Sequence, residues 1–145
     1  MSTFTEREQI VEVIGRLFYY TDEQDWEGLQ SEVFATKVEM DMTSLGAPAV
    51  AEKTPSAIFD EWAAGFEGLD AMHHQSGNYL IDIDGNSAKA KVHAIASHYK
   101  KETTEGPIRE FIGSYDFRFT KSEGAWKMNG FKFNLKYMAG NLELK

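Results

Sequence analysis

The sequence of 145 residues contains no cysteine, only three prolines and no long apolar run. The missing cysteines exclude disulfides, thiolate metal sites and a cysteine nucleophile, and they fit the reducing cytoplasm in which we expect the chain. No apolar run approaches the ~20 residues of a membrane span, so we expect no membrane insertion. The N-terminal segment MSTFTEREQIVEVI also lacks the charged-then-apolar plan of a signal peptide.

Positively charged residues are also few. Lys and Arg number 15 against 23 Asp and Glu, which gives a formal net charge of −8. A nucleic-acid partner is therefore not expected, because the phosphate backbone rewards a positive surface. What the chain does contain is 42% hydrophobic and 13% aromatic residues, which predicts an ordered core. The length fits a single domain over residues 1–145.

Two helices are predicted at the start of the chain. Apolar residues at three- and four-residue spacing indicate the first over residues 5–21, with Thr3 and Glu6 as a capping box. The second covers residues 26–33, with Asp25 as its N-cap.

A third helix and a run of strands make up the remainder. Thr54-Pro55 opens the third helix, and Gly68 is its expected stop. Alternating residues and turn signals predict a loop at 44–54 and strands at 37–43, 75–83, 87–100, 108–120 and 125–135. Three helices followed by a meander of antiparallel strands predict an α+β fold, in which a curved sheet wraps over helices.

The strand SAKAKVHAIASHYK predicts which side chains face inward. Its small residues share one face, which we expect to be buried, and His98 is the polar group of that row. The next strand places Phe111, Gly113 and Tyr115 on one face, where Gly113 again leaves space. An apolar cup with few polar groups is typical of a ligand pocket, although a packed interior fits the same pattern.

A carboxylate follows the apolar stripe of the first helix. Ile14, Phe18 and Asp22 have four-residue spacing, so they share one face. A charge there is costly unless it is hydrogen-bonded, paired or protonated, which makes Asp22 a candidate for proton transfer. The alternative is that Asp22 lies past the helix end, in solvent or capping the helix that starts at Trp26.

Three segments resemble SnoaL-like proteins of the NTF2-like superfamily. They are the pattern Asp22-x-x-Asp25-Trp26-x-x-Leu29, the run His73-His74-Gln-Ser-Gly-Asn78 before a strand, and Gly124-Ala-Trp126-Lys127 before the last strand. The resemblance implies an NTF2-like (cystatin-like) cone, with three N-terminal helices packed against a strongly curved, mainly antiparallel sheet around a pocket. It also implies a homodimer formed through the outer sheet face. This fold hosts lyases, isomerases and noncatalytic binding domains, so it does not specify an activity.

Individual site residues also match enzymes of this superfamily. Asp22 and His74 resemble the pair shared by scytalone dehydratases and hexachlorocyclohexane dehydrochlorinases, and His98 resembles a second catalytic histidine of the dehydratases. The chain departs from the dehydratases at Thr21 and Met42, where those enzymes hold the catalytic water with tyrosines. The lysine and arginine of the dehydrochlorinases are not matched either. These departures count against both the dehydration of scytalone and dehydrochlorination as the reaction of this chain.

Proton transfer by an oriented base is the mechanism that remains. Asp22 would fix the tautomer of His74, whose free nitrogen takes a proton from a carbon next to a carbonyl. His98 or Tyr115 would return the proton or hold the enolate oxygen. We predict a lyase or isomerase that needs no cofactor and no metal and acts on a small, apolar, cyclic or polyketide-like substrate. We expect its substrate-binding walls to include Tyr115, Met42, Trp62, Phe66, Ala96 and Phe111.

Three alternatives stay open. His73 and His74 with Asp22 would make a facial metal set, but adjacent strand residues point to opposite faces. A noncatalytic protein that binds a small hydrophobic ligand would tolerate a filled cup or a separated Asp–His pair. A dimerising scaffold with a vestigial pocket predicts a cup that is packed shut. An enzyme requires Asp22 and His74 within hydrogen-bond reach, beside an open cavity.

Overall fold

The structure, a computed structural model, describes residues 3–145 and contains helices and strands in the predicted order. The helices are α1 (Glu6–Glu23), α2 (Trp26–Glu32) and α3 (Pro55–Phe66). The strands are β1 (Phe34–Asp41), β2 (Ala51–Lys53), β3 (Ala71–Asp84), β4 (Ser87–Tyr99), β5 (Ile108–Ser122) and β6 (Ala125–Gly140), and a short 3-10 helix η1 (Thr43–Leu45) lies between β1 and β2.

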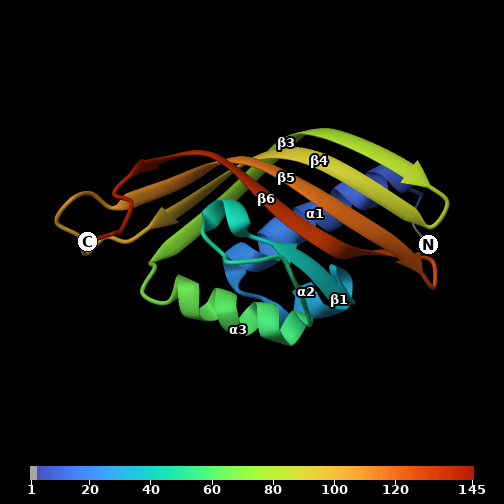
Figure 1. Cartoon of the computed structure of the whole chain (residues 1–145), viewed down its shortest axis with the longest axis horizontal. Helices are drawn as coiled ribbons and strands as arrows, with labels where there is room; N and C mark the ends of the chain where they lie inside the picture. Colours follow the sequence, from blue (N-terminus) through green and yellow to red (C-terminus); the bar gives the residue numbers. More distant parts are fainter. Residues whose placement is uncertain (1–2) are drawn as a thin grey trace.

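All six strands form one curled sheet. Their order is β2-β1-β6-β5-β4-β3, and every neighbouring pair is antiparallel except β1 and β6, which are parallel. Strands β3–β6 arch over the helices, and the sheet curls without closing into a barrel (Figure 1). The predicted α+β fold, with three helices against a strongly curved and mainly antiparallel sheet, is confirmed.

Of the two predicted helix caps, one is confirmed and one is wrong. Asp25 caps α2 as predicted, since its carboxylate accepts from the N–H of Gly28 at 2.9 Å. The capping box of α1 is formed by Thr5 and Glu8 rather than by Thr3 and Glu6. The same Thr-x-x-Glu spacing occurs at both places, but the helix begins at Glu6, and Thr5, directly before it, has the extended backbone that an N-cap requires.

Several elements extend beyond their predicted limits. Strand β1 starts at 34 rather than 37, although it ends at 41 rather than 43. Strand β3 starts at 71 rather than 75, and β6 continues to 140 rather than 135. Neighbouring strands supply backbone partners at these ends, for example between Ala71 and Tyr99, so pairing persists where the apolar alternation has stopped. The predicted loop at 44–54 is also not wholly irregular. It contains most of η1 and the edge strand β2, which pairs with β1 from Val38 to Met40.

The core lies between α1 and the concave face of the sheet. Ile10, Ile14 and Leu17 of α1 are at most 1% exposed. The predicted inward face of β4 is confirmed, because its even-numbered residues are all buried: Ala88, Ala90, Val92, Ala94, Ala96 and His98. Among residues 3–145, no helix is both long enough and apolar enough to cross a membrane.

Gly113 does not leave space in the cup, contrary to the prediction. A Cβ built there would lie 2.1 Å from the backbone oxygen of Asn134 and 2.9 Å from the ring of Phe133. The register between β5 and β6 shifts between Ile112 and Gly113. The backbone of β6 therefore approaches β5 closely at this bulge, in the space that a side chain at position 113 would occupy.

We expect Gly113→Ala to lower the free energy of unfolding by about 1–3 kcal/mol, because a carbonyl and a packed ring must move to admit the methyl group. Gly77→Ala is the matched control within the same sheet, since no atom lies within 4 Å of a Cβ at Gly77. That control should change stability by less than about 0.5 kcal/mol. Denaturant unfolding curves of the three proteins measure the difference, and equal effects of the two substitutions would contradict the assignment.

Candidate active site

A cavity of about 170 Å³ lies between the helices and the concave face of the sheet. Within residues 3–145, no Asp, Glu, Lys or Arg lines this cavity, and the polar side chains of its walls include Thr21, His74, His98 and Tyr115. The apolar lining residues are Leu17, Phe18, Met42, Leu45, Trp62, Phe66, Ala96, Phe111, Phe131 and Phe133. Because an engineered apolar cavity of about 150 Å³ holds benzene, this space has room for about one ring.

Asp22 and His74 are joined by two hydrogen bonds. Asp22 lies in the last turn of α1, and His74 lies on β3. The ring Nδ1–H of His74 donates to Oδ1 of Asp22 at 2.6 Å, and the backbone N–H of His74 donates to Oδ2 at 3.0 Å. Both side chains are largely shielded, with 18% of Asp22 and 9% of His74 exposed. Asp22 is thus helical and paired, and it neither caps α2 nor lies free in solvent.

The paired carboxylate sets the chemistry of the His74 ring. A neutral imidazole that donates through Nδ1 carries its lone pair on Nε2, which is then the basic nitrogen. Nε2 has no hydrogen-bond partner within residues 3–145, and the ring forms part of the cavity wall, whereas Asp22 lies behind it. Phe18, one turn before Asp22, stacks on the ring with a centroid distance of 5.4 Å and an interplanar angle of 8°. The ring is therefore held in place by two residues of one helix.

His98 has the opposite hydrogen-bond polarity. It faces Arg109 directly across β4 and β5, and Nη2 of Arg109 donates to Nδ1 of His98 at 2.8 Å. An Nδ1 that accepts places the ring hydrogen on Nε2, which becomes a donor. His98 is 8% exposed and lines the same cavity as His74. The cavity thus has one histidine whose Nε2 accepts and one whose Nε2 donates.

His98 is kept neutral by its surroundings. Burial lowers its pKa to about 4, and the positive charge of Arg109 is the second cause, followed by His74, while Asp22 acts in the opposite direction. At neutral pH His98 is therefore an uncharged donor and a poor base.

Tyr115 adds a second donor to the cavity. The residue is 5% exposed, and its hydroxyl has no hydrogen-bond partner within residues 3–145. Burial raises the pKa of the phenol, and the negative charge of Asp22 raises it further. Tyr115 therefore stays protonated and can donate to a ligand atom in the cavity.

The other predicted wall residues all line this cavity: Met42, Trp62, Phe66, Ala96 and Phe111. Their roles toward a ligand stay predictions. Six further wall residues were not among those predicted: Leu17, Phe18, Thr21, Leu45, Phe131 and Phe133. Arg109, which bonds His98, was not predicted either. A signal for Arg109 was present, because it has the same strand parity as Phe111 and Tyr115 and is therefore a charge on an inward-facing row.

His73 lies outside this arrangement. Its residue is exposed, and its Nε2 bonds to Gln75 at 2.8 Å rather than facing Asp22. Within residues 3–145, no three His, Cys, Asp or Glu side chains gather in a group that would hold a metal ion.

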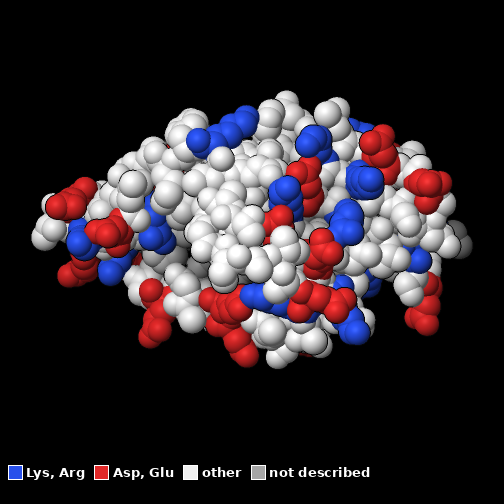
Figure 2. All heavy atoms as spheres, viewed as in Figure 1, with Lys and Arg blue, Asp and Glu red and all other residues white. Residues whose placement is uncertain are grey.

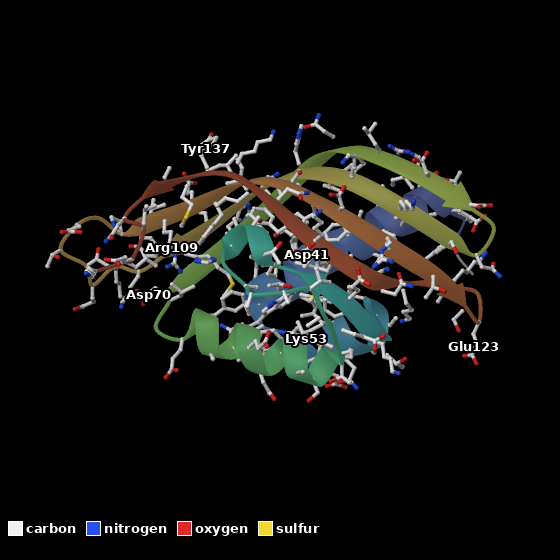
Figure 3. All side chains as sticks on the ribbon, in the orientation of Figure 1. Asp41, Lys53, Asp70, Arg109, Glu123 and Tyr137 are labelled. Carbon is white, nitrogen blue, oxygen red and sulfur yellow. The ribbon has the colours of Figure 1, made fainter. Side chains whose placement is uncertain are left out.

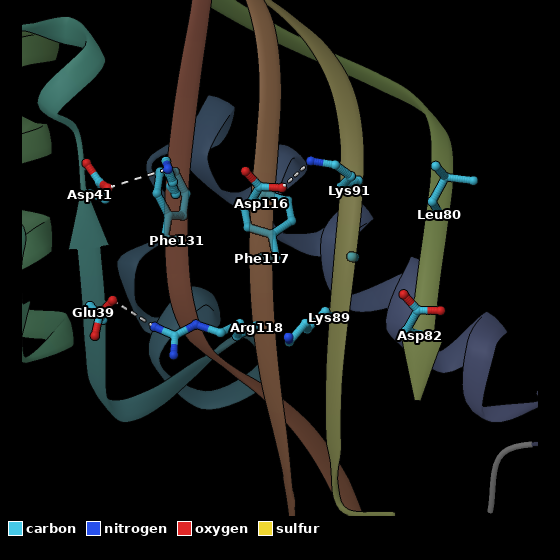
Figure 4. A pocket seen from close by; sticks show the side chains of 12 residues that line it. Glu39, Asp41, Leu80, Asp82, Lys89, Lys91, Asp116, Phe117, Arg118 and Phe131 are labelled. Atoms are coloured by element: carbon cyan, nitrogen blue, oxygen red, sulfur yellow. Dashed lines mark hydrogen bonds and ion pairs between the residues drawn. The ribbon is translucent and has the colours of Figure 1, made fainter. Parts of the chain in front are cut away.

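A larger hollow of about 470 Å³ lies on the outer face of the sheet, and its walls are charged. Figure 4 shows ion pairs across it, including Glu39–Arg118 at 3.0 Å and Asp116–Lys91 at 3.1 Å. Acidic and basic side chains alternate on this part of the surface (Figure 2). Asp41 is shielded there, with 18% of its side chain exposed, but hydrogen bonds from Thr43 lower its pKa, so it stays ionised. The described lining residues of this hollow include no histidine, and its other charges pair with one another in solvent, so we place the candidate active site in the smaller cavity.

Comparison with known protein families identifies the chain. The family model of the SnoaL-like domain matches residues 2–132. The chain belongs to the SnoaL-like family. Comparison with curated proteins gave no match for this SnoaL-like protein.

Solved structures share the fold of this SnoaL-like protein at low sequence identity. A protein from Kribbella flavida aligns with TM-score 0.88 and 20% identity, over 92% of this chain and 93% of that one. A provisionally assigned scytalone dehydratase from Novosphingobium aromaticivorans aligns with TM-score 0.80 and 18% identity, over 94% and 87%. The hexachlorocyclohexane dehydrochlorinase LinA-type3 from Novosphingobium barchaimii aligns with TM-score 0.78 and 12% identity, over 93% and 89%. At these identities the likeness establishes the fold.

The neutral state of His98 predicts a specific pH dependence of stability. The pKa of His98 is about 4 in the native protein, below the ordinary value of about 6.5 expected in the unfolded chain. Below pH ~6.5 the unfolded chain therefore binds a proton that the native protein rejects. The resulting stability is complete above pH ~6.5 and is lost as pH falls toward 4, by up to about 3 kcal/mol.

Denaturant unfolding between pH 4 and 8 measures this loss. His98→Gln should flatten the dependence between pH 4 and 6.5. His93→Gln on the same strand is the control, because His93 is exposed on the outer face, and its effect on the slope should be smaller. Identical slopes for His98→Gln and the unmodified protein would show that His98 is not held neutral.

Proposed function

We propose that this protein catalyses proton transfer on a small neutral carbonyl compound, as a lyase or isomerase that needs no cofactor. The observation that carries the proposal is the Asp22–His74 pair, with Nδ1 and Oδ1 2.6 Å apart, beside an open cavity. This is the arrangement expected of an oriented base. A filled or closed cup, which the scaffold alternative requires, does not match the cavity of about 170 Å³.

The proposed reaction begins at a carbon next to the carbonyl. Nε2 of His74 takes the proton from this carbon, and the electron pair of the C–H bond moves to the carbonyl oxygen to form an enolate. Asp22 stabilises the resulting imidazolium through Nδ1–H. Nε2–H of His98 and the hydroxyl of Tyr115 donate to the enolate oxygen, where negative charge develops.

The second step decides between two outcomes. If the imidazolium of His74 returns its proton to another carbon of the conjugated enolate, the double bond moves and the product is an isomer. If it protonates a hydroxyl on the β carbon, the electron pair of the enolate expels this group as water. Both outcomes return His74 to its neutral state, and neither consumes a further reactant.

The cavity walls support a substrate of limited size and charge. No Asp, Glu, Lys or Arg of the described part of the chain lines the space, so a charged ligand would lose its hydration without an ionic partner. Aromatic walls from Trp62, Phe66 and Phe111 favour a flat or cyclic apolar body. We therefore propose a one-ring compound, or a larger polyketide-like one with a single ring seated in the cavity.

The family supports the reaction class. Structural relatives of this SnoaL-like protein include a provisionally assigned scytalone dehydratase and a dehydrochlorinase, and both names denote lyases that eliminate a small group. Thr21 and Met42 in place of the dehydratase tyrosines leave no phenols at those two positions. The donors that this cavity offers come instead from His98 and Tyr115.

Deuterium exchange tests the base with simple ketones in place of the natural substrate. We expect the protein in D₂O to speed exchange at the acidic carbons of neutral cyclic ketones, with 2-cyclohexen-1-one as the first probe, measured by proton NMR. Asp22→Asn and His74→Ala should each lower the rate by about 10²–10⁴, because the first leaves the base unoriented and the second removes it.

Glu23→Gln is the matched control for Asp22→Asn. Glu23 is the next residue of α1 and is exposed, so the exchange rate of the Glu23→Gln variant should equal that of the unmodified protein. Unchanged exchange in both site variants would contradict the proposed base. Binding of the ketones without any exchange would favour the alternative of a noncatalytic pocket for small hydrophobic ligands, which the apolar lining also supports.

We also propose that the protein is a homodimer formed through the outer sheet face. A row of apolar residues crosses this face in register: Ile95 on β4, Ile112 on β5 and Tyr137 on β6. Ile95 is 44% exposed and Tyr137 is 58% exposed. Tyr137 borders the uncharged area of the surface that lies beside the alternating charges (Figures 2 and 3). Covering such a row with the same row of a second copy would remove it from water.

Light scattering coupled to size exclusion tests this arrangement. The unmodified protein should have twice the chain mass of 16.4 kDa, and Tyr137→Lys should shift it toward the monomer, because a buried unpaired ammonium opposes association. Tyr19→Lys is the control, since Tyr19 is 72% exposed and belongs to α1, outside the row of apolar residues on the sheet. A monomer at all concentrations would refute the dimer.

A further inference from the structure

Arg109 is a partly buried cation without a carboxylate partner among residues 3–145. Its guanidinium makes three contacts: Nη2 donates to Nδ1 of His98 at 2.8 Å, Nη1 donates to the carbonyl oxygen of Leu142 at 3.3 Å, and its carbon lies 5.3 Å from the ring centre of Phe111. Its Nε is buried without a hydrogen-bond partner. Burial of this kind also lowers the pKa of the guanidinium, so the placement of the charge is unfavourable by itself.

A structural arginine would normally be paired with Asp or Glu. Another arginine of β5 has such a partner: Arg118 forms a salt bridge with Glu39 at 3.0 Å on the exposed face of the sheet. The shorter of the two hydrogen bonds from Arg109 goes instead to the imidazole of His98. Since the orphaned Nε and the shielded charge both oppose folding, the contact with His98 is more readily explained by a role in the site than by stability.

We propose that Arg109 is a positioning residue, which fixes His98 in the tautomer whose Nε2–H donates into the cavity. This inference rests on the proposed function and deepens it. It assigns His98 to the carbonyl oxygen of the substrate and His74 to the acidic carbon, because a ring locked as a donor at Nε2 cannot accept the proton there. The substrate class is thereby limited to neutral compounds that present an acceptor oxygen to one histidine and a C–H acid to the other.

The charged and titratable groups that act on His98 are few. Arg109 faces it from β5, His74 from β3 and Asp22 from α1, while Phe66 of α3 contributes only an aromatic edge at a centroid distance of 6.0 Å. Among residues 3–145, only Arg109 makes a hydrogen bond to a ring nitrogen of His98. If His98 were protonated, Nδ1–H would point at the guanidinium donors, so the contact opposes the charged ring as well as the other tautomer.

The C-terminal segment steadies this contact. The carbonyl oxygen of Leu142, just beyond β6, accepts from Nη1 of Arg109. The preceding residue, Asn141, is 8% exposed, and its side-chain amide donates to the carbonyl oxygens of Gly106 and Lys145. Arg109 lies at the end of the sheet nearer the C-terminus (Figure 3). The end of the chain is thus tied to the hairpin between β4 and β5 and holds the arginine against His98.

The experiment reads the ring of His98 directly. Long-range proton–nitrogen NMR of the ¹⁵N-labelled protein should show Nδ1 of His98 unprotonated and Nε2 protonated from pH 5.5 to 8. In Arg109→Met we expect the pKa of His98 to rise by about one unit, because a neighbouring positive charge and an Nδ1 donor are lost together. Arg109→Lys retains a cationic donor and should return the pKa toward that of the unmodified protein. Arg118→Met, on the same strand, should leave it unchanged.

Kinetics with the 2-cyclohexen-1-one exchange assay supply the second measurement. Arg109→Met should lower kcat at least about tenfold with a smaller change in KM, since a donor to the enolate oxygen acts mainly in the transition state. Arg118→Met should keep the unmodified rate.

Two results would overturn the inference. One is an Nδ1 of His98 that carries the hydrogen in the unmodified protein, which requires no variant and is independent of folding defects. The other is an identical His98 pKa in Arg109→Met, Arg109→Lys and the unmodified protein. If the tautomer is as expected but no ketone is exchanged, Arg109 still fixes His98, and the proposed reaction alone is refuted.

Discussion

The site depends on one carboxylate that accepts two hydrogen bonds from one residue. Asp22 binds both the ring and the backbone N–H of His74, so it joins the end of α1 to β3 and sets the tautomer of the base at the same time. A shielded carboxylate is stable only with such partners. The same contact that makes the charge tolerable inside the fold therefore makes Nε2 of His74 basic and directs the lone pair away from Asp22.

The cavity combines opposite hydrogen-bond polarities within apolar walls. His74 presents an acceptor because its Nδ1–H is bound by a carboxylate, and His98 presents a donor because its Nδ1 is bound by a guanidinium. Tyr115 adds a hydroxyl that has no protein partner in residues 3–145. In a space of low polarity these groups act at full strength on a bound molecule, because water does not compete for them. The aromatic walls hold the molecule without charge, so the few polar groups decide its orientation.

Local patterns predicted most of the architecture. The alternation of β4 identified its buried face, Asp25 was recognised as the cap of α2, and the spacing of Phe18 and Asp22 placed both on one face of α1. These features follow from periods of two and about 3.6 residues, which are properties of the chain itself. Strand ends and the capping box of α1 were placed less accurately. Pairing partners and exact dihedral angles decide those limits, and neither is written in a single segment.

The sequence by itself determined that the fold is α+β, that small and aromatic side chains face one interior, and that Asp22, His74 and His98 are the polar residues to consider. Only the tertiary structure decided what these residues do to one another. Hydrogen-bond polarity depends on which nitrogen meets which partner, and those partners lie 52 residues apart for His74 and 11 apart for His98. The role of Arg109 depends on this pairing. A charge on an inward-facing row is unfavourable by itself, and only the register of β4 and β5 places it beside the imidazole of His98. The prediction that Gly113 leaves space in the pocket was wrong for the same reason, because the backbone of the neighbouring strand β6 occupies that space.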